Sequence, residues 1–135
     1  MENKVIACLR YINTTYRGSN GYFCGYVGVK DNSMLPACFQ NSGLDETVSG
    51  EILLDDLVIV HKGITYANKF NCFTPVIPIT DIPSDYHTYY FYGFDLGHAG
   101  DEEICEDYQY AKAEVLSMKE QIEKVIAKLC PSTGD

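Results

Sequence analysis

The chain has 135 residues, of which 46% are hydrophobic and 21% are charged, which is enough for one domain with a buried core. Ten Lys and Arg against nineteen Asp and Glu give a formal net charge of −9. This balance disfavours nucleic acid and anionic membrane surfaces as partners, because both select basic patches. The sequence has neither a run of roughly 18 apolar residues nor the pattern of an export signal, so we expect a cytoplasmic protein.

The first half of the chain predicts several β-strands. Residues 5–11 form an apolar run, and residues 22–29 alternate two sets of side chains, with Cys24 and Tyr26 on one face and Val27 and Val29 on the other. Two glycines within residues 22–29 indicate that a ligand or another backbone approaches there. Residues 30–50 are irregular and suit a functional loop or a lid. Residues 56–61 predict a further strand, and residues 64–67 can pair with it.

The second half predicts an edge segment, a central strand and one long helix. Residues 71–83 contain three prolines, so they suit an edge or a connector. Residues 89–94 are apolar on both faces, as in a central strand. From about residue 106 to residue 129, apolar residues recur at helical spacing (Tyr108, Ala111, Val115, Met118, Ile122, Val125 and Leu129). This stripe favours a helix packed on its own sheet, and the alternative is the seam of a dimer.

Cysteine and tyrosine usage bears on the class of protein. The six cysteines contain no C-x-x-C spacing, which favours reduced structural thiols over a zinc or redox motif. Six of the nine residues from 86 to 94 are Tyr or Phe. Such density suits either stacking against a flat polar ligand or an aromatic β core.

The polar residues that suggest chemistry lie after these strands. His61 ends one apolar run, and Asp95, His98 and Asp101 alternate with small residues in a glycine-rich loop. Three interpretations stay open. The first is a ligand pocket, the second is a divalent-metal site formed by His61, Asp95, His98 and Asp101, and the third is a packed turn in which the acids accept bonds from main-chain amides.

In the pocket interpretation, each residue type has a distinct task. Asp95 and Asp101 accept hydrogen bonds from sugar hydroxyls or a base amine, and His98 contacts a phosphate. Lys62 pairs with a pyrophosphate, while Tyr92, Tyr90 or Tyr26 stacks on a purine. The enzyme alternative depends on His61 and His98, because imidazole titrates near neutral pH and can transfer protons at a phosphodiester.

Three motifs in this chain resemble a family of small proteins encoded by bacterial viruses. The family has a Gly-Tyr-Val segment, a His-Gly-Gly-x-Thr-Tyr motif and a Gly-Phe-Asp-x-x-His-Ala-Gly-Asp motif, followed by an amphipathic helix. The matching residues here are 25–27, 61–66 and 93–101, and the resemblance spans about residues 21 to 129. Lys62 stands where the family has its first motif glycine.

The resemblance implies a counter-defence protein that binds and sequesters a nucleotide immune signal of the cyclic or modified ADP-ribose type without cleaving it. It favours a binding protein over an enzyme and implies no catalytic residue, no metal and no cofactor. The implied partners are a small nucleotide-derived ligand and further copies of the chain in a homo-oligomer, in the cytoplasm of an infected bacterium. The alternatives are a phosphodiesterase acting through His61 and His98, and an acidic inhibitor that blocks a host immune enzyme. The expected ligand-binding residues are Tyr26, His61, Lys62, Thr65, Tyr92, Asp95, His98 and Asp101.

The expected fold class is α+β, with a mostly antiparallel sheet of about five strands and one C-terminal amphipathic helix. We expect a single domain over residues 1–135, with a β-rich part over 1–95, a motif loop over 96–105 and the helix over 106–129. The order of the strands does not follow from the sequence.

Overall fold

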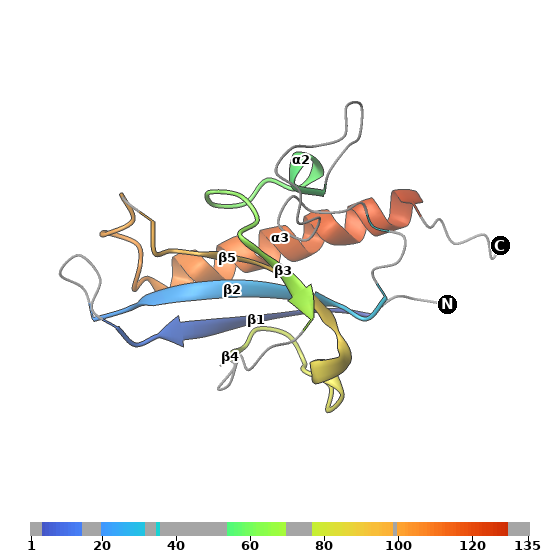
Figure 1. Ribbon diagram of the computed structural model, residues 1–135, viewed down its shortest axis with the longest axis horizontal. Helices are drawn as coiled ribbons and strands as arrows, with labels where there is room; N and C mark the ends of the chain where they lie inside the picture. The colour runs from blue at the N-terminus through green and yellow to red at the C-terminus, as the bar shows by residue number, and fades with distance from the viewer. Residues whose placement is uncertain are drawn as a thin grey trace.

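The computed structural model describes residues 4–14, 20–31, 35, 54–69, 77–98 and 100–129. Five antiparallel strands form one sheet in the order β3-β5-β2-β1-β4, and a long helix crosses one face of it (Figure 1). The strands are β1 (Val5–Ile12), β2 (Tyr22–Val29), β3 (Tyr66–Lys69), β4 (Ile77–Pro78) and β5 (Tyr90–Asp95). The helices are α2 (Leu54–Leu57), the 3-10 turn η1 (Tyr86–Thr88) and α3 (Tyr108–Leu129). The expected α+β class is therefore confirmed.

The sheet buries a different set of side chains on each face. Val27, Tyr92 and Phe94 face α3 and belong to its core, whereas Cys24, Tyr26 and the other alternate residues form a second cluster on the opposite face. Tyr89 belongs to that second cluster, and Ile82 and Tyr86 pack against it. The predicted alternation of residues 22–29 and the interior position of the aromatic strand are both confirmed.

Helix α3 uses its apolar stripe to cover the sheet. Ala111, Val115, Met118 and Ile122 are fully buried, and the helix contacts β1 and β2. The helix begins at Tyr108, about two residues later than predicted. Asp107 acts as its N-cap, since its carboxylate accepts the Tyr110 N–H at 3.0 Å. The stripe thus packs within one copy of the chain rather than serving as a dimer seam.

Glycines in the central strands lie beneath aromatic rings of the neighbouring strand. Gly25 pairs with Phe94, and Gly28 pairs with Phe91. A Cβ atom built on Gly25 would lie 2.4 Å from the Phe94 ring, and one on Gly28 would lie 2.6 Å from the Phe91 ring. The close approach predicted at these glycines is therefore made by the protein's own aromatic side chains.

The predicted strand over residues 56–61 is wrong. Residues 54–57 form the short helix α2, and residues 58–60 run outside the sheet, with Val58 and Val60 buried and Ile59 82% exposed. The backbone of Ile59 hydrogen-bonds to the Gln121 side chain rather than to a neighbouring strand. Gln121 accepts the Ile59 N–H and donates to the Ile59 carbonyl, both at 2.7 Å. Val58 and Val60 pack into the core that α3 helps to form, whereas Ile59 faces outward. The partner strand predicted at 64–67 lies slightly later, at β3.

Three of the cysteines, Cys8, Cys24 and Cys105, are buried free thiols. Burial raises the pKa of the Cys8 thiol to about 12, and burial followed by the charge of Asp95 raises that of Cys24 to about 12. These thiols match the prediction of reduced structural cysteines. The other three cysteines and almost all of the irregular stretch 30–50 lie outside the described residues.

Candidate functional site

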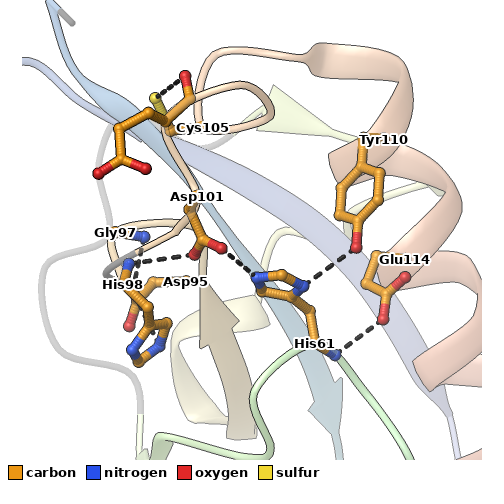
Figure 2. Close-up of polar contacts among 9 residues, drawn as sticks. His61, Asp95, Gly97, His98, Asp101, Cys105, Tyr110 and Glu114 are labelled. Carbon is orange, nitrogen blue, oxygen red and sulfur yellow. Dashed lines mark hydrogen bonds and ion pairs between the residues drawn. The ribbon is translucent and has the colours of Figure 1, made fainter. Parts of the chain in front are cut away.

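His61 lies where three parts of the chain meet. Its Nε2 atom is 2.8 Å from Asp101 Oδ1, and its Nδ1 atom is 3.0 Å from the Tyr110 hydroxyl (Figure 2). Its backbone N–H donates to Glu114 Oε2 at 2.8 Å. Asp101 lies within the motif loop, whereas Tyr110 and Glu114 stand about one turn apart in the first two turns of α3. The site therefore joins the segment after α2, the loop and the last helix.

Asp101 links both predicted histidines. Its side chain is only 2% exposed, and its Oδ2 atom accepts the backbone N–H of His98 at 3.1 Å while Oδ1 faces His61. Gly100 has a φ of 96°, a left-handed conformation that favours glycine and lets the chain turn before Asp101. A buried carboxylate needs such partners, because an unpaired charge away from water is costly. Asp101 is therefore an internal anchor of the loop.

The two contacts of His61 match one tautomer of a neutral imidazole. When Asp101 is ionised it can only accept, and a neutral His61 then carries its proton on Nε2 and offers its Nδ1 lone pair to the Tyr110 O–H. Burial, followed by the charges of Glu114 and Asp101, raises the pKa of Tyr110. The Tyr110 phenol thus remains protonated at neutral pH and donates to the imidazole.

Asp95 and His98 form the more exposed part of the loop. Asp95 Oδ1 lies 3.3 Å from His98 Nε2, with the two side chains 30% and 33% exposed. The same carboxylate accepts the Gly97 N–H at 2.8 Å through Oδ1 and the Thr65 hydroxyl at 3.3 Å through Oδ2. Each carboxylate oxygen can accept more than one bond, so a partly exposed Asp95 can still accept from a ligand.

Lys62 occupies a strained backbone position beside His61. Its φ is 58°, and Gly63 follows with a φ of 83° and closes a turn by donating its N–H to Val60 O at 2.8 Å. A left-handed conformation costs a non-glycine residue roughly 1–2 kcal/mol. A glycine at position 62 would adopt this conformation without that cost. The exposed Lys62 side chain adds a cation next to the cluster.

The predicted stacking tyrosines do not join the cluster. Tyr26 is buried on the sheet face opposite α3, and Tyr92 is buried in the core beneath α3. The register causes the separation, because Tyr26 pairs with Gly93, so that the adjacent Tyr92 points to the other face. Tyr90 is partly buried and packs against Tyr92, with ring centroids 5.1 Å apart. The aromatic density therefore builds mostly core.

Three residues of the site were missed from the sequence. Tyr110 and Glu114 are four positions apart on the polar edge of the helical stripe, a spacing that places both side chains on one face. Tyr22 lies against the loop, since a Cβ atom built on Gly97 would be 3.0 Å from its ring. The helical spacing was a readable signal for Tyr110 and Glu114, but nothing local linked Tyr22 to Gly97.

Two further features bear on what the molecule can bind. Within the described ranges, no three His, Cys, Asp or Glu side chains are arranged to hold a metal ion. A cavity of about 250 Å³ lies along the C-terminal half of α3, away from the cluster. It is lined by Leu57, Gln121, Lys124, Val125 and Lys128 and includes none of the predicted site residues.

Comparisons with protein-family models, curated proteins and solved structures find no match to this chain. Among the described residues, no helix combines the length and the apolar character needed to cross a membrane.

Proposed function

We propose that this protein binds a nucleotide-derived immune signal of the cyclic or modified ADP-ribose type and sequesters it without cleavage. The observation that carries the proposal is the partly exposed Asp95–His98 pair on a loop that the buried Asp101 anchors from within. A rigid support lowers the entropy lost when a loop binds a ligand. The working compartment proposed is the cytoplasm of an infected bacterium.

Each contact in the proposed site follows from residue chemistry. Asp95 accepts from a ribose hydroxyl, while His98 and Lys62 contact the phosphates. Thr65 already donates to Asp95 and holds it in place. Tyr22 lies against Gly97 and offers an aromatic ring next to the loop for contact with the base. His61 and Asp101 support the loop from behind.

The state of His61 favours binding over cleavage of a phosphodiester by the two histidines. Both of its ring nitrogens have protein partners, Asp101 and Tyr110, at 2.8 and 3.0 Å. An imidazole that transfers protons directly to a substrate needs one nitrogen within hydrogen-bond reach of that substrate. We therefore place His61 in the support of the site.

A thermal-shift titration with cyclic ADP-ribose, ADP-ribose and AMP tests the proposal, because a ligand bound only by the folded state raises the unfolding temperature. We expect a saturable rise with at least one ADP-ribose compound and recovery of that compound intact after denaturation. His98→Ala and Asp95→Ala should abolish the rise. His87→Ala is the matched control, since His87 is exposed in η1, outside the site. The absence of a shift with every compound, or recovery of cleaved product, would contradict the proposal.

A second candidate is a blocking inhibitor of a host immune enzyme. The observation that favours it is a run of exposed acids directly after the loop, formed by Glu102, Glu103, Glu106 and Asp107. Such a surface suits a basic partner. An infection assay measures whether the protein protects a virus from the immune system of its bacterial host. This candidate predicts that Glu102→Lys/Glu103→Lys abolishes the protection of the virus, whereas Asp95→Ala leaves it intact. The sequestration proposal predicts the reverse.

We also propose a homo-oligomer, whose interface must use residues other than the buried stripe of α3. Light scattering coupled to size-exclusion chromatography measures its mass, and a monomer at all concentrations would refute it.

A further inference from the structure

The chain Asp101–His61–Tyr110 has the arrangement of a nucleophile, a base and an orienting acid. In such triads a hydroxyl hydrogen-bonds to an imidazole, whose other nitrogen is held by a buried carboxylate. Here the two distances are 3.0 Å and 2.8 Å, and the carboxylate is 2% exposed. We propose that Tyr110 is a nucleophile that accepts an acyl group from uncharged, activated carbonyl esters.

Each component has a defined part in the step. His61 Nδ1 removes the Tyr110 proton as the phenol oxygen forms a bond to the carbonyl carbon. The tetrahedral adduct then collapses, the bond from carbon to the leaving-group oxygen breaks, and the leaving group departs as an anion. The proton stays on His61 as an imidazolium that Asp101 stabilises. His61 then releases its proton to the solvent, and attack by water on the acyl-tyrosine frees the acid and regenerates the phenol. His61 and Tyr110 are catalytic residues in this scheme, and Asp101 is a positioning residue.

A raised pKa does not prevent this step. Burial and the neighbouring carboxylates keep Tyr110 protonated at rest. Triad hydroxyls are also protonated at rest and lose the proton to the base only as they attack. The arrangement therefore needs the imidazole and not a standing phenolate.

The charges around Tyr110 select the substrate class. Glu114 accepts the backbone N–H of His61, and Asp101 contacts the imidazole nitrogen on the side away from Tyr110. The negative charges of both carboxylates act on the Tyr110 phenol and raise its pKa. They repel anionic esters and phosphoryl groups but not neutral esters. This inference goes beyond the sequestration proposal and does not depend on the nucleotide ligand.

Acetyl transfer from p-nitrophenyl acetate to the full chain tests the inference, with intact-mass and peptide mass spectrometry locating the acetyl group. Tyr11 is the internal comparator, because its hydroxyl donates to Glu106 at 3.0 Å and has no imidazole partner. We expect Tyr110 to be acetylated about a hundredfold faster than Tyr11, an effect at the low end of positioned-base catalysis. Anionic p-nitrophenyl hemisuccinate should react more slowly. Equal rates at Tyr110 and Tyr11 would overturn the inference, whether or not nucleotides bind.

Variants distinguish a catalytic role of His61 as the base from a purely structural role. Tyr110→Phe should remove the adduct, and His61→Gln and Asp101→Asn should reduce Tyr110 acetylation to the rate at Tyr11. Tyr11→Phe is the matched control and should leave Tyr110 acetylation unchanged. In the wild type, the ratio of the Tyr110 rate to the Tyr11 rate should fall in acid, because a protonated imidazole cannot accept the phenol proton. Asp101, Glu114 and Tyr110 are the titratable groups that contact His61. A ratio that is independent of both pH and His61→Gln would refute the role of the base. If a variant does not fold, the wild-type ratio and pH profile still decide.

Discussion

At the scale of single residues, Lys62 holds the most unusual backbone conformation of the described non-glycine residues. It alone among them has a positive φ, and it stands next to the central imidazole of the site. Strain at such positions tends to gather at functional sites, where the surrounding structure maintains it. Here the turn that Lys62 helps to form aims His61 at Asp101 and Tyr110.

Lys62→Gly should stabilise the protein. Relief of the left-handed conformation gains roughly 1–2 kcal/mol, and the extra freedom of glycine in the unfolded chain removes roughly 0.5–1 kcal/mol of that gain. We expect a net rise of about 0.5–1 kcal/mol in the free energy of unfolding, measured with urea. Lys62→Ala is the control, since it removes the same charge but keeps the Cβ atom. Equal stability of the two variants would show that the conformation is not strained.

At the scale of elements, long-range side-chain contacts replace strand pairing for residues 58–61. Gln121 and Glu114 on α3 bind the backbone of Ile59 and His61, more than fifty positions earlier in the chain. A local sequence pattern carries no information on such partners. This is why the apolar run of this segment wrongly predicts a strand of the sheet.

Gln121→Ala should loosen this segment. Two hydrogen bonds to Ile59 are lost, but water can replace them because the contact is exposed, so we expect a cost of about 1 kcal/mol. Hydrogen exchange at the Ile59 amide should become faster. Gln109→Ala, an exposed change in the first turn of the same helix, should alter neither quantity. Unchanged exchange at Ile59 in Gln121→Ala would contradict the contact.

Gly25→Ala should destabilise the sheet by about 1–3 kcal/mol, because the new methyl group overlaps the Phe94 ring. The added Phe94→Leu change should recover part of that loss in the double variant, after allowance for the cost of Phe94→Leu alone. The measurement is a double-mutant cycle on unfolding free energies. Strictly additive effects would show that the methyl group and the ring do not compete for space.

At the scale of the whole molecule, the sequence predicts the class of fold better than the site. The strands at residues 5–11, 22–29 and 89–94 and the helix follow from local periodicity, and all four are present within a few residues. The site depends on strand order and register, which no local pattern determines. Asp95 and His98 meet because they are neighbours in one loop. Tyr26 and Tyr92 lie on opposite faces of the sheet because of the register between β2 and β5, which the sequence does not determine.

Buried thiols predict a loss of stability in alkali. Folding raises the pKa of Cys8 and Cys24 from 9.0 to about 12, so the folded state holds their protons while the unfolded state releases them. The contribution of these thiols is fully present below pH 9 and falls as pH rises toward 12, by up to about 1.4 kcal/mol per pH unit for each thiol. Urea unfolding between pH 8 and 11 measures this slope. Cys8→Ala/Cys24→Ala should flatten it, and an unchanged slope would assign the effect to other groups.

The glycines beneath aromatic rings restrict how this sequence can diverge. A side chain cannot enter at Gly25 or Gly28 unless Phe94 or Phe91 shrinks in the same lineage. Descendants of this chain must therefore keep each glycine with its ring or exchange both together. Paired substitution at positions 25 and 94, and at 28 and 91, is the evolutionary trace that this sheet should leave.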